Sequence, residues 1–126
     1  MSTRELDLDN DNTIDVTNLS EELRVLPSIM FGYREILAKA EEESAIKKAE
    51  YEELCAAKYL EIRAKEGKIT ESTLEAMIEV DLEVKAAKRA MLEAQRDYKT
   101  LDGYMESMRA KKDSLIQLSA DQRKEK

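Results

Sequence analysis

A stripe of apolar side chains repeats at alternating steps of three and four residues from Val84 to Leu115. A seven-residue repeat keeps such a stripe on one side of a helix only if the helix winds around a partner. Lys112 interrupts the series. The segment is therefore expected to form one strand of a coiled coil or helical bundle, and its expected packing residues are Val84, Ala87, Met91, Ala94, Tyr98, Leu101, Met105, Met108 and Leu115.

The composition favours long solvated helices over a compact globule. Charged residues make up 39% of the 126 residues, aromatic residues only 5%, and the chain has three glycines and one proline. Helices of this kind bury their apolar stripes against each other or against other copies. We therefore expect an all-α fold in which two long antiparallel helices form a coiled-coil-like hairpin, with short flanking and corner helices, and assemble as a homo-oligomer.

A few residues mark the expected ends of these helices. Pro27 disfavours helical geometry in the residue before it, so a break is expected there. Gly67 is suited to end a helix, and Thr70 and Asp81 are suited to begin one. The expected segments are an acidic disordered leader at 1–17 and a single helical domain at 18–126, with a short helix at 18–26, a long helix at 27–65, a short helix at 71–80, a long helix at 82–118 and a basic tail at 119–126. Gly103, inside the last helix, suggests close approach by a neighbouring helix.

The residues that most catalytic and metal sites need are missing from the sequence. There is no histidine, and the only cysteine, Cys55, lies on an apolar stripe where a buried role is expected. We therefore expect no enzymatic activity, no cofactor and no metal site. No signal-like start and no apolar run of roughly 20 residues is present, which favours a cytoplasmic protein without a membrane partner.

Basic residues gather near the expected corner between the long helices, although the net charge is −7. Lysine and arginine can pair with phosphates, and an aromatic ring can stack on an unpaired base. The alternative is a solvated face in which neighbouring glutamates pair with these cations. The candidate nucleic-acid-binding residues are Lys58, Tyr59, Arg63, Lys65, Lys68, Lys85, Lys88 and Arg89, and a second basic group comprises Arg109, Lys111, Lys112 and Arg123.

Two stretches carry a resemblance to a known family. The stretch KITESTLEAMIEVD, from Lys68 to Asp81, and the stretch MRAKKDSLIQL, from Met108 to Leu118, resemble parts of phage recombination mediators of the UvsY-like type. The similarity extends over roughly 26–123. The resemblance implies a small helical homo-oligomer that loads a RecA-like recombinase onto single-stranded DNA coated with a single-strand-binding protein. In that family, basic residues late in the first long helix contact DNA, and the matching positions are Lys58, Arg63 and Lys65.

The sequence thus predicts a non-enzymatic mediator of DNA recombination and repair, in the host cytoplasm if phage-encoded. Its partners would be single-stranded DNA, a RecA-like recombinase and a single-strand-binding protein. One alternative is a structural or protein-interaction coiled coil that does not bind DNA. Another is a prefoldin-like chaperone, against which the short corner at Gly67 counts. A third is a phage inhibitor of a host nucleic-acid enzyme that acts through the acidic leader. In a DNA-binding protein, the same leader could instead mimic nucleic acid and occupy the basic surface until the true ligand displaces it.

Overall fold

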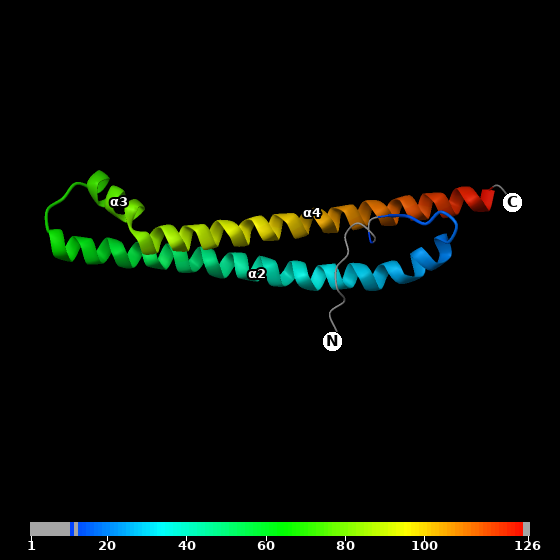
Figure 1. The fold of residues 1–126 in the computed structure, drawn as a ribbon, viewed down its shortest axis with the longest axis horizontal. Helices are drawn as coiled ribbons and strands as arrows, with labels where there is room; N and C mark the ends of the chain where they lie inside the picture. The colour runs from blue at the N-terminus through cyan, green and yellow to red at the C-terminus, as the bar shows by residue number, and fades with distance from the viewer. Residues whose placement is uncertain (1–10, 12, 125–126) are drawn as a thin grey trace. The chain divides into compact units, whose positions relative to one another are not determined.

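The structure, a computed structural model, describes Asp11 and residues 13–124. Three helices make up most of this part, and none of the residues it describes forms a strand: α2 (Leu19–Glu66), α3 (Glu71–Val80) and α4 (Leu82–Lys124) (Figure 1). The prediction of an all-α fold with two long helices that pack together is confirmed. Residue contacts divide the chain into two units, each of which combines a stretch of α2 with a stretch of α4. We call Met1–Lys39 with Lys99–Lys126 unit 1, and Ala40–Tyr98 unit 2.

The corner between α2 and α4 is built from three capping residues. Gly67 has a φ of 71°, which L side chains rarely adopt, and its N–H donates to the Arg63 carbonyl. The Thr70 hydroxyl accepts from the Thr73 N–H at 3.2 Å and caps α3, whose bounds equal the expected range. The Asp81 carboxylate accepts from the first turn of α4, at 2.9 Å from the Glu83 nitrogen and at 3.1 Å from that of Val84.

The break expected at Pro27 does not occur, because α2 is continuous from Leu19 to Glu66. The separate helices expected at 18–26 and 27–65 are therefore wrong. Proline removes one N–H donor, the one that would serve the Leu23 carbonyl, but the helix on either side buries Leu26 and Met30 in a shared core. That burial outweighs one lost hydrogen bond. Figure 1 shows the first turns of α2 angled away from the turns that follow.

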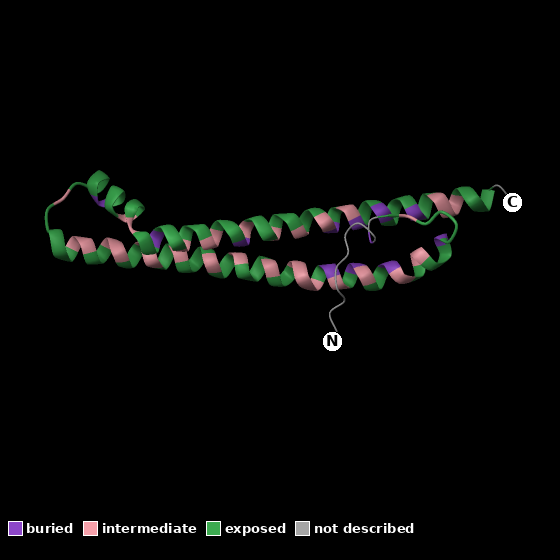
Figure 2. Cartoon of the chain, viewed as in Figure 1, coloured by how far each residue is buried: buried purple, intermediate pink, exposed green. Residues whose placement is uncertain are grey.

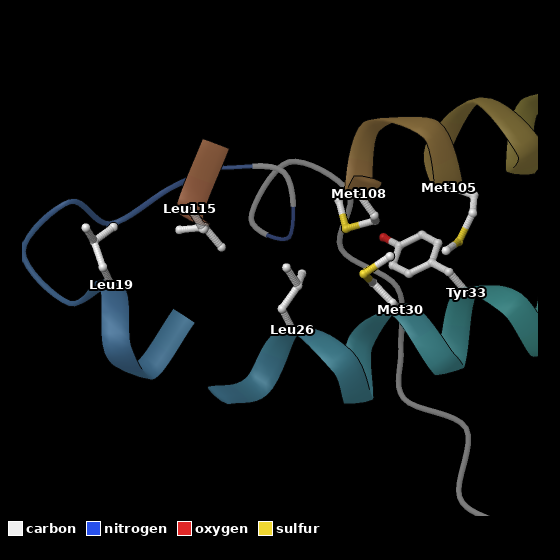
Figure 3. Close-up of a cluster of buried hydrophobic side chains, with 7 residues drawn as sticks. All are labelled: Leu19, Leu26, Met30, Tyr33, Met105, Met108 and Leu115. Atoms are coloured by element: carbon white, nitrogen blue, oxygen red, sulfur yellow. The ribbon is translucent and has the colours of Figure 1, made fainter. Parts of the chain in front are cut away.

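The core of unit 1 is a cluster of seven buried apolar side chains from α2 and α4 (Figure 3). The Tyr33 ring lies among the side chains of Met30, Met105 and Met108, an arrangement in which flexible thioethers pack against an aromatic face. Burial in this cluster keeps these α2 and α4 stretches together. The cluster comprises Leu19, Leu26, Met30, Tyr33, Met105, Met108 and Leu115.

Unit 2 has fewer buried apolar residues than unit 1 among those the structure describes. Its described buried residues are Leu74, Val84 and Ala94, and the α2 stretch contributes none of them (Figure 2). The expected stripe on that stretch, which includes Cys55, is only half-buried. Several large apolar side chains of the unit remain exposed, among them Leu60, Val80 and Leu82.

The packing side of α4 agrees with the seven-residue pattern. Five of the nine expected packing residues are buried, and the other four are half-buried. Two details differ. Lys111, and not its neighbour Lys112, lies at the buried level between Met108 and Leu115. No helix of the same chain makes the close approach expected at Gly103, because a Cβ atom built there meets nothing within 4 Å. The helix continues past the expected end at 118 to Lys124.

Most of the expected disordered leader at 1–17 lies outside the described residues. Its described end, Asp11 and residues 13–17, is attached to unit 1, and we call it the clasp segment. Ile14 packs against the core cluster, and the Val16 carbonyl accepts from the Gln122 side chain at 3.3 Å. Local composition predicts disorder here, whereas these contacts come from residues far along the chain.

Candidate nucleic-acid interface

Lys58 lies beside the start of α4, where it meets carboxylates. Its Nζ is 3.4 Å from Asp81 Oδ2, 3.7 Å from Glu83 Oε2 and 3.9 Å from Glu61 Oε2. Burial alone would lower the pKa of Lys58, but the three carboxylates outweigh it and raise the pKa. The ammonium is thus held charged by partners inside the chain. A phosphate at this position would have to displace them.

Tyr59 and Arg63 are engaged in the same way with the start of α3. The Tyr59 hydroxyl donates to Glu71 Oε1 at 3.0 Å, and the Arg63 guanidinium pairs with the same carboxylate and donates to the Ile69 carbonyl. The neighbouring Tyr59 side chain, followed by the carboxylate of Glu71, raises the pKa of Arg63. The guanidinium carbon also lies 5.6 Å from the centroid of the Tyr59 ring. The ring that was expected to stack on a base therefore already faces a cation.

The remaining candidates on the corner and on α4 are exposed and more available. Among the interactions of the described residues, no ion pair involves Lys65, Lys68, Lys85, Lys88 or Arg89. Lys85, Lys88 and Arg89 line an open hollow that runs along one face of α4, together with Arg96. We call these four cations the basic stripe; Leu92 and Glu93 lie between Arg89 and Arg96 in the same hollow. Arg96 is 3.9 Å from the carboxylate of Asp97, and both side chains are largely exposed.

The second basic group is divided between buried and exposed positions. The Lys111 side chain is only 4% exposed, and its Nζ lies 3.0 Å from Glu22 Oε2 and donates to the Asp11 carbonyl. Asp11 in turn accepts from the Tyr33 hydroxyl at 3.1 Å. Lys112 is exposed, so adjacent lysines have opposite surroundings. The other two members, Arg109, which pairs with Glu106, and Arg123, are also exposed.

The buried role of Lys111 was missed from sequence, although a signal existed. A helix has 3.6 residues per turn, so a step of three from Met108 returns to the packing side as readily as a step of four. The strict heptad register pointed to Lys112. The partner Glu22 lies in the opposite long helix, at a place no local pattern identifies.

Metal binding and membrane crossing each require a recognisable local feature. Within Asp11 and residues 13–124, no three His, Cys, Asp or Glu side chains are grouped so that they could hold a metal ion. The same part of the chain has no helix with the length and apolar character needed to cross a membrane. Comparison of the chain with protein families, curated proteins and solved structures gave no match.

Proposed function

We propose that this chain is a non-enzymatic, single-stranded-DNA-binding recombination mediator that helps to load a RecA-like recombinase onto DNA coated with a single-strand-binding protein. The resemblance of the stretches at 68–81 and 108–118 to UvsY-like mediators supports the recombination role. The basic stripe supports the DNA contact, and this observation carries the proposal.

Three features of the basic stripe suit a nucleic-acid backbone. Lys85, Lys88 and Arg89 are exposed and are not held by carboxylates, unlike Lys58 and Arg63. Their spacing places them on one side of α4, where phosphates of an extended strand could meet them in turn. Half-exposed Leu92 lies in the same hollow and offers an apolar surface to a base. The DNA contact is thus proposed for the start of α4, whereas the family resemblance pointed to the end of the first long helix.

A net charge of −7 argues for weak affinity in a single chain. An oligomer would repeat the basic stripe, and several weak contacts on one strand would multiply into useful avidity. A mediator that must later yield the strand to a recombinase suits this arrangement, because weak contacts are readily exchanged.

The test is the binding of a fluorescein-labelled oligothymidine, measured by anisotropy at about 50 and about 200 mM salt, where phosphate contacts lose strength. Three phosphate contacts to a single strand give a slope of about 2 in a plot of log affinity against log salt concentration, so they weaken binding by about 15-fold when the salt is raised fourfold. Without these contacts, this part of the salt dependence should be lost. We expect this loss in the triple variant K85A/K88A/R89A. The matched control K39A/K48A/K99A removes three exposed cations that form no ion pair among the described residues and should bind as wild type.

Equal binding by the two triple variants would refute the placement of the DNA contact. No binding by wild type at about 50 mM salt, at protein concentrations where oligomers form, would refute DNA binding altogether. Lys58→Ala is a poor test, because it would also break the contacts to Asp81 and Glu83.

A second candidate function, a protein-interaction coiled coil, is favoured by the exposed apolar side chains of unit 2. Leu82 is 82% exposed, Leu60 69% and Val80 65%, while the α2 stretch of the unit buries no residue among those described. Such side chains gain stability by packing against other copies or another protein. Sedimentation of wild type and of L60S/L82S distinguishes the two roles: oligomers that dissociate in the variant and never bind DNA favour the interaction coiled coil.

A further inference from the structure

Unit 1 contains an open apolar groove that the DNA-binding proposal does not use. It is about 260 Å³ in volume, and Ile116, one of its lining residues, is 49% exposed. This volume is below the roughly 300–1,000 Å³ of small-molecule pockets, so the groove suits a few side chains of a bound segment. Its lining comprises Leu23, Leu26, Pro27, Met30, Arg34, Lys112 and Ile116.

The groove is on a different side of α4 from the clasp segment. Lys111 meets the clasp segment, whereas Lys112, about 100° further around the helix, lines the groove. One flank of the core cluster is thus covered by part of this chain, and another is open. Leu26 and Met30 belong to both the groove and the core cluster (Figure 3), so a ligand in the groove would rest on a preformed apolar floor.

Of the described residues that line the groove, the two charged ones are both positive. Arg34 of α2 and Lys112 of α4 are exposed, and no ion pair involves either one among the residues that the structure describes. The adjacent cation of α4, Lys111, is buried and paired with Glu22, and the nearest exposed cation before it, Arg109, is paired with Glu106. Two unsatisfied cations beside an apolar floor complement a ligand that carries both carboxylates and apolar side chains.

Pro27 removes one main-chain donor from the part of α2 that lines the groove. Because proline has no N–H, it cannot donate to the Leu23 carbonyl as an ordinary residue four positions later would. Leu23 and Pro27 both line the groove. A carbonyl without its helical donor can accept from the backbone N–H of a bound segment.

We propose that this groove binds an acidic peptide segment of a partner protein, with apolar side chains on the Leu26 and Met30 floor, carboxylates at Arg34 and Lys112, and a backbone N–H on the Leu23 carbonyl. The proposal is independent of DNA binding, because the groove lies in unit 1 and the basic stripe in unit 2.

The test uses the full chain and a fluorescein-labelled ten-residue peptide of alternating Asp and Leu, titrated by anisotropy. We expect saturable binding that weakens about tenfold in R34E/K112E and in a probe with Asn in place of Asp. A probe with Lys in place of Asp should bind R34E/K112E better than wild type. The matched control K39E/K99E reverses two exposed cations of the same unit and should leave Asp–Leu binding unchanged.

Pro27→Ala tests the main-chain contact without loss of fold. The new N–H can occupy the Leu23 carbonyl, so this variant should melt at a higher temperature yet bind the Asp–Leu probe about fivefold more weakly. No saturation by 1 mM probe, or equal binding by R34E/K112E and K39E/K99E, would overturn the proposal. So would a change in sedimentation of R34E/K112E without probe binding, since the groove would then be an interface between copies of this chain.

Discussion

Lys111 and Lys112 are adjacent in sequence, and exchanging each for methionine should have very different effects. The Lys111 ammonium lies 3.0 Å from a Glu22 carboxylate oxygen, and the two side chains are 4% and 22% exposed. At that separation an effective dielectric constant of about 20 gives an attraction of about 5 kcal/mol, most of which is offset by desolvation of the two charges. Removal of one partner leaves the charge of the other buried and unpaired, which typically costs about 3–5 kcal/mol when burial is complete.

Because Glu22 keeps about a fifth of its exposure, water can replace part of the lost contact. We therefore expect Lys111→Met to lower the free energy of unfolding by about 2 kcal/mol, which corresponds to a melting temperature about 8 °C lower. Lys112→Met should change stability by less than about 0.5 kcal/mol, because its side chain is exposed. Thermal and urea unfolding monitored by circular dichroism at 222 nm would measure both, at one fixed protein concentration.

The double variant E22Q/K111M provides the decisive control. Neutralising Glu22 removes the unpaired buried charge, so the double variant should recover part of the stability that Lys111→Met loses. If Lys111→Met is as stable as Lys112→Met, or if E22Q/K111M is less stable than the sum of the two single changes predicts, the buried pair does not stabilise unit 1 and the reasoning is refuted.

Three further predictions concern two glycines, the Asp81 cap and the core of unit 1. Gly103→Ala should raise the free energy of unfolding in urea by about 0.5–1 kcal/mol, because the added methyl group meets nothing. Gly67→Ala should lower it by about 1 kcal/mol, because Gly67 has a positive φ. A loss of stability in Gly103→Ala or a gain in Gly67→Ala would contradict the assigned conformations. Backbone N–H groups of α4, and then Lys58, hold the pKa of Asp81 below its ordinary 3.8, so its contribution to stability is present above that value and lost as the pH falls through the folded pKa. Thermal unfolding between pH 5 and 2 should therefore be less pH-dependent in Asp81→Asn than in wild type, and parallel curves would exclude the effect. Leu115→Ala should cost about 2–5 kcal/mol and Ile116→Ala less than about 0.5, since the first is fully buried and the second half-exposed; equal losses would place the core elsewhere.

The parts of the fold that depend on local chemistry could be predicted from sequence. Thr70 and Asp81 cap helices because their short side chains reach nearby N–H groups. The seven-residue pattern also relates residues that are close in sequence, and it identified the packing side of α4. The helix break predicted at Pro27 is absent because the local preference of proline is outweighed by burial of Leu26 and Met30 in a core assembled from distant residues.

The candidate site was predictable as a set of residue types but not as a set of available side chains. Lys58 and Arg63 were expected to meet DNA, yet acids of α3 and α4 surround them across the corner. Helical spacing relates residues within a helix and says nothing about which carboxylates another helix presents. The groove at Arg34 and Lys112 joins residues 78 positions apart and has no local signature.

The contacts of the clasp segment close very long loops, and this affects the order of folding. Asp11 meets Lys111 and Val16 meets Gln122, at separations of 100 and 106 residues, whereas the helices and the corner at Gly67 form from near neighbours. Loop-closure entropy makes such remote contacts late steps in folding, and a region held by few of them is among the first to open. Hydrogen exchange should therefore find the amides of residues 13–18 unprotected at times when the centre of α4 is still closed, and Lys111 would be uncovered by brief local openings of the folded chain.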